Sequence, residues 1–403
     1  MPLTELPRFR LLRLSRAQWV RCGTAALYAG VVILFLVSIG RYYHRNTGFT
    51  TLIHFGDQFS DRVLPVVRYT RHAPSREELG GDGQFYAQIA LEPLLRNRQI
   101  DRALDFPPYR ARRVLFSWSA YLLGFGQPER VLKVYAMQNI VAWLVLALAL
   151  LRWLPPSRPR NLLPWIGCLY SAGMLISVQF SMLDGLSLLL LTLAILAQER
   201  QCGWLATGMM AISGLGRETN LIGSGLLVSR MPHTRRDFAV LGGTALCVVM
   251  PFFLWTRYLA HLYPDFSYSN SDLVGVPFAG YLAKMSATLS DFHRFGWHSD
   301  VRFEIVMLVA LSVQLVFVAL RWDWKSAWWR MAAPYCLLFA ITGYGVWGPP
   351  GGAPRVLLPL TVAFNVLVTR LEGPGFWVLV VLGNLSVVTG IAMIEMPWVS
   401  TLF

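Results

Sequence analysis

Long apolar runs recur along the whole chain and limit what it can fold into. After a first run over Cys22–Gly40, they cover about 131–151, 162–180, 183–197, 204–228, 238–259, 305–320, 328–346, 356–369 and 376–393. An α-helix needs roughly 20 apolar residues to cross a bilayer. The composition agrees, because 55% of the residues are apolar and only 14% are charged, against about 25% charged residues in soluble domains. The sequence predicts an all-α, polytopic membrane helix bundle of about 10–11 transmembrane helices, forming one domain over residues 1–403.

The positive charge lies mostly in arginines between the apolar runs. The formal net charge is +14, and short arginine clusters beside apolar runs are typical of topology signals and of lipid headgroup contacts. No basic stripe with interleaved aromatic residues stands apart from these runs, so nucleic-acid binding is not expected. The five cysteines have no paired spacing and are predicted to be small apolar residues.

The arginines before the first run set the expected orientation. They precede a run that is too long for a signal peptide and has no cleavage site after it. We therefore expect an uncleaved first helix with a cytoplasmic N-terminus, in a multi-pass protein of a bacterial inner (plasma) membrane. These arginines are Arg8, Arg10, Arg13, Arg16 and Arg21.

Two polar stretches are predicted to lie outside the cytoplasm. The first extracytoplasmic loop covers 41–113 and the second covers 261–302. The apolar piece 114–126 is too short to cross comfortably, so it is either a short crossing helix or a surface or re-entrant helix. If it lies on the surface, and if the run 204–228 is broken near Gly214-Leu215-Gly216, every short arginine-bearing link falls on the cytoplasmic side. We prefer this arrangement because it satisfies the positive-inside rule.

One acid in the first loop is flanked by glycines, in Gly80-Gly81-Asp82-Gly83-Gln84-Phe85-Tyr86. Two interpretations stay open at this point. Glycine and aspartate together form turns, so the motif is explained by a turn alone. Alternatively, glycines on both sides of a carboxylate let a substrate approach it closely.

Charged residues also interrupt the apolar runs at Asp184, at Arg217-Glu218 and at Arg355. Asp184 either caps the next helix or serves a site. Arg217 and Glu218 form either a structural ion pair or part of a wet cavity, because buried charges in a membrane need partners. Arg355 either anchors in lipid headgroups or clamps a phosphate with its guanidinium fork.

Motifs for other chemistries are missing from the sequence. There is no Walker loop, GxSxG or CxxC, and the histidines lack ligand spacing. The pattern leaves open whether a divalent cation, Mg²⁺ or Mn²⁺, assists.

The order of these features resembles the GT-C class of integral membrane glycosyltransferases. That class includes the protein O-mannosyltransferases, the aminoarabinose transferases of lipid A and the GPI mannosyltransferases, which use polyprenyl-phosphate sugars. The similarity covers about residues 17–370: a first helix, a long outer loop with an early acid, Pro107-Pro108-Tyr109 leading into a short helix, a second acid and a later arginine.

The resemblance implies a function and a set of roles. By similarity, Asp82 and Asp184 are the catalytic carboxylates, Asp82 being the general base, and Arg217 opens onto the cavity. The candidate substrate-binding residues are Gln84, Tyr86, Tyr109, Arg110, Arg217, Glu218 and Arg355. The implied reaction moves a sugar from a polyprenyl-phosphate donor to a glycan, lipid or protein acceptor, with inversion at the anomeric carbon.

Two departures from the family pattern matter. Many of these enzymes carry paired acids in the first loop, whereas Asp82 stands between Gly81 and Gly83, which puts metal dependence in doubt. The chain also ends soon after its last apolar run, so acceptor recognition is expected from the loops.

Two other functions compete with this one. A transporter or flippase for an amphiphilic or anionic solute also uses broken helices and buried charges, although no internal repeat is evident. A non-catalytic scaffold protein would tolerate alanine at Asp82 and Asp184 together, and neither active function permits that.

Overall fold

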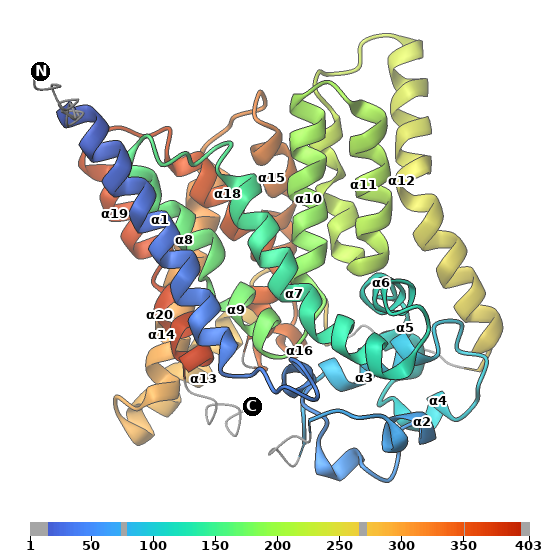
Figure 1. Ribbon diagram of the computed structural model, residues 1–403. Helices are drawn as coiled ribbons and strands as arrows, with labels where there is room; N and C mark the ends of the chain where they lie inside the picture. The colour runs from blue at the N-terminus through green and yellow to red at the C-terminus, as the bar shows by residue number, and fades with distance from the viewer. Residues whose placement is uncertain (1–14, 74–78, 266–271, 350, 396–403) are drawn as a thin grey trace, which may run out of the picture.

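The computed structural model describes residues 15–73, 79–265, 272–349 and 351–395, and its regular structure there is helical (Figure 1). The described residues form no strand, and their only β-type pairings are two isolated bridges, His44 with Gly48 and Val274 with Thr342. The all-α prediction is therefore confirmed for this part of the chain. Arg8, Arg10 and Arg13, on which the expected orientation depends, lie outside the described residues.

Four helices among the described residues are long and apolar enough to cross a membrane. Two further candidates are pairs of helices bent by 47° and 41° at a short break. The four are α1 (Arg16–Gly40), α7 (Pro128–Leu150), α12 (Arg235–Leu262) and α14 (Ser299–Leu320), and the pairs are α8 (Leu162–Leu169, after the 3-10 turn Pro159–Asn161) with α9 (Ala172–Gln179), and α19 (Pro374–Gly383) with α20 (Ser386–Glu395). A multi-pass membrane protein is compatible with this set.

The number of candidate spans is lower than the ten or eleven predicted, because several apolar runs form shorter helices. Helix α10 has 16 residues and is therefore about 24 Å long, short of the roughly 30 Å hydrocarbon core. The other short apolar helices pack against neighbours inside the bundle. These helices are α10 (Asp184–Glu199), α11 (Gly203–Gly216), α15 (Ala327–Ile341) and α18 (Leu358–Val368).

Segment 41–113, which the sequence predicts to be the first extracytoplasmic loop, forms short helices that gather at one end of the bundle (Figure 1). Prolines begin two of them, where a missing N–H costs nothing. The loop contains the 3-10 turns Thr50–Ile53 and Asp57–Phe59, then α2 (Pro65–Tyr69), α3 (Gly83–Leu91), α4 (Ile100–Ala103) and α5 (Pro107–Ala111). Segment 261–302, the predicted second extracytoplasmic loop, includes a helix too, α13 (Ala279–Phe295).

Helix α6 (Leu115–Leu123) follows the first loop and has nine residues. It is about 13 Å long and cannot cross a bilayer, and Figure 1 shows it nearly end-on below the lower end of α11. Of the two alternatives for 114–126, a complete crossing is therefore excluded by length.

Helix α11 ends at Gly216, and the chain continues from Glu218 as a 3-10 helix to Leu227. The break falls at Arg217, whose backbone is extended with φ −155° and ψ 119°. The predicted interruption near Gly214-Leu215-Gly216 is confirmed. Two short helices, α16 (Tyr344–Trp347) and α17 (Gly352–Val356), complete the end of the bundle that holds the first loop (Figure 1).

Candidate functional site

A small cavity of about 170 Å³ lies where segment 41–113 meets the start of α10, the end of α11 and helix α17. It brings together residues that are up to 274 positions apart in the chain, from Asp82 to Val356. Its charged and tyrosine lining consists of Asp82, Tyr86, Tyr109, Arg110, Arg113, Asp184, Arg217 and Arg355. Seven of the nine predicted site residues therefore line this cavity, and the other two, Gln84 and Glu218, do not.

Asp82 stands at the N-terminal end of α3, but its side chain makes no capping hydrogen bond. Instead, its carboxylate pairs with the guanidinium of Arg110 at 2.8 Å, and 38% of the Asp82 side chain is exposed. A turn therefore explains the backbone conformation at Asp82, but it does not use the carboxylate, which lines the cavity. Helix α5 holds Arg110 in place, with Asp105 bonding it from the other side at 2.6 Å.

The glycines around Asp82 serve packing against the protein and do not open space for a substrate. A Cβ at Gly83 would lie 2.3 Å from the Phe180 carbonyl oxygen, and one at Gly80 would lie 2.4 Å from backbone atoms of His54 and Gly56. Gly80 also has a positive φ of 66°, which side chains rarely adopt. The interpretation that the glycines admit a substrate is wrong: they let this loop seat against neighbouring backbone and so fix the position of Asp82.

Charge controls the protonation of Asp82. Its partial burial would raise the pKa of the carboxyl group, but Arg110, together with Arg355 and Arg113, outweighs this effect and holds the pKa below its ordinary value. Asp82 is therefore ionised at neutral pH.

The opposite wall of the cavity is a buried ion pair. Asp184 is the first residue of α10, where the helix dipole favours a negative charge, and its residue exposure is 3%. It pairs with Arg217 and accepts a hydrogen bond from the Ser177 hydroxyl at 2.8 Å. The break after α11 allows this, because the extended backbone at Arg217 turns its side chain out of the helix. The two adjacent charges at 217 and 218 do not pair with each other.

Glu218 pairs instead with Arg113, through two hydrogen bonds of 2.6 and 2.8 Å. Glu218 does not itself line the cavity, whereas Arg113 does. Arg113 was not among the residues that the sequence singled out for the site. A signal for it existed in the arginine cluster that ends the first loop, but only the fold pairs it with Glu218.

Arg355 is the guanidinium in the cavity that is least neutralised. Four arginines and two carboxylates line the space, and Asp105 and Glu218 neutralise Arg110 and Arg113 from behind. Arg355 lies 3.8 Å from Asp184, already engaged by Arg217, and its Nε donates to the Gly351 carbonyl at 3.0 Å. A guanidinium placed in this way can receive an anionic group from a ligand.

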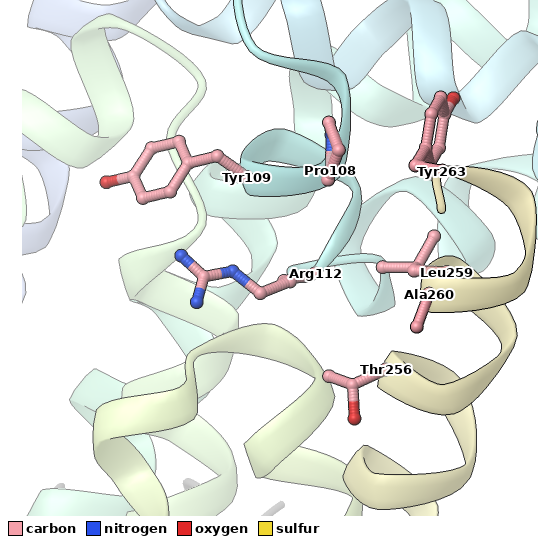
Figure 2. Close-up of a pocket in the computed structure, with 7 residues that line it drawn as sticks. All are labelled: Pro108, Tyr109, Arg112, Thr256, Leu259, Ala260 and Tyr263. Carbon is pink, nitrogen blue, oxygen red and sulfur yellow. The ribbon is translucent and has the colours of Figure 1, made fainter. Parts of the chain in front are cut away.

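Tyr109 separates this cavity from a second one of about 170 Å³ between α5 and α12. Three guanidiniums surround its ring, with centroid distances of 5.7 Å for Arg110, 5.1 Å for Arg112 and 4.7 Å for Arg113. Figure 2 shows the second cavity, with the tyrosine ring and the Arg112 guanidinium directed away from the α12 residues that form its other side.

Gln84 does not reach the cavity. It is buried at 1% exposure, its amide oxygen accepts from the Gly56 N–H at 3.1 Å, and its amide nitrogen donates to the Leu79 carbonyl at 3.1 Å. Both ends of the side chain thus hold the backbone of the glycine loop. The predicted substrate contact of Gln84 has no support in this geometry, and the residue positions the loop instead.

The cavity offers a poor donor set for a metal. No group of three or more His, Cys, Asp and Glu side chains that could hold a metal ion occurs among the described residues. The carboxylates of Asp82 and Asp184 are each engaged by a guanidinium. A divalent cation would have to displace these arginines, so we derive no step through Mg²⁺ or Mn²⁺.

No protein-family model, curated protein or solved structure matches this chain. The resemblance to GT-C glycosyltransferases therefore depends on the order of the sequence features and on the residues named above.

Proposed function

We propose that this protein is a membrane glycosyltransferase that moves a sugar from a polyprenyl-phosphate donor to an acceptor hydroxyl. The observation that carries the proposal is the pairing of unlike groups in one cavity: a half-exposed carboxylate, Asp82, opposite an incompletely neutralised guanidinium, Arg355. Transfer from a sugar phosphate needs a base for the acceptor and a cation for the leaving phosphate.

The reaction would be a direct displacement. The acceptor oxygen attacks the anomeric carbon, and its proton passes to the Asp82 carboxylate. The bond between the anomeric carbon and the phosphate oxygen breaks at the same time, and the polyprenyl phosphate leaves with one more negative charge. Arg355 stabilises that charge, with the nearby guanidiniums of Arg217 and Arg113 adding to the positive field. A single displacement inverts the anomeric configuration.

Arg110 tunes the base. By holding the pKa of Asp82 low, it keeps the carboxylate ionised but makes it a weak base. The proton is then transferred late, when the acceptor oxygen has already begun to bond to carbon and has become more acidic. Of the two tyrosines that line the cavity, the partly exposed Tyr109 would contact the sugar, whereas Tyr86 is only 1% exposed and supports the Arg110 guanidinium.

The proposed setting is a bacterial inner membrane, with the cavity on the extracytoplasmic side and a glycan, lipid or protein as acceptor. The support for this setting is the arrangement of arginine-bearing links in the sequence, together with candidate spans of membrane length.

The test compares two acids that share Arg110. Purified protein in lipid vesicles is incubated with polyprenyl-phosphate sugars and an acceptor mixture, and donor loss and product formation are measured. Asp82→Asn should lower transfer on the order of 10²–10⁴-fold, the usual contribution of a general base. Asp105→Asn is the matched control, because Asp105 binds the same guanidinium but does not line the cavity, and it should retain most activity. Full transfer by Asp82→Asn would remove the assignment.

A transporter or flippase is the second candidate, favoured by the broken segment at Arg217. Interrupted helices at charged residues are typical of solute sites in transporters. Counterflow of a labelled lipid phosphate between the two leaflets, without any covalent product in the assay above, would favour this function over glycosyl transfer.

A further inference from the structure

A groove of about 570 Å³ runs along the C-terminal half of α14, far from the candidate site. Helix α14 spans 22 residues and is about 33 Å long. Its first turns lie near the candidate site, because Glu304 bonds Lys284, and Lys284 also donates to the Gly348 carbonyl beside the cavity. The groove lies at the other end. Its lining is Ser312, Val313, Val316, Phe317, Leu320, Arg321, Leu371 and Leu379.

The walls of the groove are apolar and accessible from outside. Val316 is 53% exposed and Leu320 is 81% exposed, on a helix that qualifies as a membrane span. A water molecule occupies about 30 Å³ of liquid, so this volume fits a hydrocarbon chain much better than an isolated ion or water. The facing wall comes from Leu379 of α19, which packs against α14.

A positive charge stands at the end of the groove. Arg321 is the residue directly after α14, and its guanidinium lies 5.8 Å from the centroid of the Phe317 ring in the groove. No carboxylate in the described part of the chain forms an ion pair with it: the nearby Asp323 is engaged by Arg370. The charge of Arg321 is therefore open to an anionic group at the membrane surface.

Tryptophans cluster beside this arginine. Trp322, Trp324 and Trp329 lie with ring centroids 4.6 to 6.2 Å apart, and Trp322 is 72% exposed. Tryptophan concentrates at the level of lipid headgroups. The end of the groove thus has two features of a membrane interface: a cation in its lining, Arg321, and a tryptophan cluster that begins with the next residue of the chain.

We propose that this groove binds an anionic phospholipid, with one acyl chain along α14 and the headgroup phosphate at Arg321. The charge selects an anionic headgroup over a zwitterionic one, because each arginine near an anionic lipid surface contributes to attraction. The bound chain fills the space between α14 and α19. This proposal does not depend on the proposed function, since none of its residues lines the central cavity.

Native mass spectrometry of the full-length protein in detergent micelles tests the proposal, with phosphatidylglycerol and phosphatidylcholine of identical chains as probes. The wild-type protein should bind phosphatidylglycerol about fivefold more tightly. Arg321→Gln should abolish that preference, and Val316→Trp, which fills the groove and keeps the charge, should weaken both lipids. Arg236→Gln is the control, because Arg236 is an exposed arginine at the start of α12, and it should behave as the wild type.

Cross-linking gives an independent readout. A phosphatidylglycerol with a photoreactive acyl chain should label peptides that contain 312–321 and 371–379 in the wild type and not in Val316→Trp. Equal binding of the two lipids by the wild type, an unchanged preference in Arg321→Gln, unchanged binding in Val316→Trp, or labelling elsewhere only would each overturn the proposal.

Discussion

The two walls of the central cavity hold similar ion pairs in different surroundings. On one wall, Asp184 and Arg217 have side-chain exposures of 3% and 11%. On the other, Asp82 is 38% exposed while its partner Arg110 is 9% exposed and binds a second acid, Asp105. When a buried ion pair loses one member, the other charge stays buried without compensation. When an exposed carboxylate is removed, water can solvate the partner that it leaves. The two pairs are therefore expected to contribute differently to stability, and Asp82 is the carboxylate that acts as base in the proposed reaction.

The largest expected effect tests this difference directly. Asp184→Ala leaves Arg217 buried without its partner and should lower the free energy of unfolding by about 3–5 kcal/mol. Asp82→Ala should change it by only about 0–1 kcal/mol, because Arg110 keeps Asp105. Unfolding of both variants in mixed detergent micelles measures the two values, and equal losses would contradict the division between the walls.

A smaller loss of stability is expected from the glycine loop that positions Asp82. In Gly83→Ala, the new methyl would lie 2.3 Å from the Phe180 carbonyl oxygen, so the loop must shift, at a cost of about 1–3 kcal/mol. Gly203→Ala is the matched control at the start of α11, where a Cβ would meet nothing within 4 Å, and its effect should stay within about 0.5 kcal/mol. Thermal unfolding compares them; a neutral Gly83→Ala would mean that the loop tolerates displacement.

Arg355 provides the next test, on substrate affinity. Arg355→Lys keeps a positive charge but loses the planar fork that matches phosphate oxygens, so KM for the lipid-linked donor should rise about tenfold, equivalent to 1.4 kcal/mol. Arg370→Lys serves as control, since that arginine pairs with Asp323 outside the cavity. An unchanged KM in Arg355→Lys would leave this guanidinium without a role in donor binding.

The smallest effect concerns pH. In the proposed reaction Asp82 must be unprotonated to accept a proton. Because its folded pKa is lowered, transfer should persist at neutral pH and be lost as the pH falls through that lowered value. Its contribution to stability has the same sign and disappears over the same acidic range. Arg110→Gln removes the main cation and should raise the pKa of Asp82, moving the acid limb of the rate profile to higher pH.

Arg98→Gln, an exposed arginine paired with Asp101 at 3.5 Å, should leave that limb in place. Rate profiles between acidic and neutral pH decide the matter. A limb that does not move in Arg110→Gln would show that another group controls the acidic side.

The sequence alone predicts much of the fold and part of the site. Hydrophobic runs locate most of the helices, and the positive-inside rule correctly predicts the break near Gly214-Leu215-Gly216. The preferred topology and the resemblance to GT-C enzymes together predict that Asp82, Asp184, Arg217 and Arg355 lie toward one side, and the structure brings these four side chains to one cavity.

Pairing could not be predicted in the same way. Arg217 and Glu218 are adjacent in the chain, yet each binds a residue elsewhere, Asp184 and Arg113 respectively. The extended backbone at Arg217 makes the side chains of Arg217 and Glu218 point in different directions. The periodicity of apolar residues carries no information about the backbone geometry at such a break. Gln84 fails for a related reason: an amide beside a candidate acid suggests a ligand contact, whereas its bonds to Gly56 and Leu79 depend on a loop contact 28 residues away.

Tyr109 has a consequence for any molecule designed to occupy this protein. Tyr109 lines both small cavities. A compound that binds in one cavity and pushes the ring outward would therefore reduce the volume of the other cavity. Compounds directed at the cavity beside α12 would therefore compete with ligands of the central cavity without touching Asp82 or Arg355.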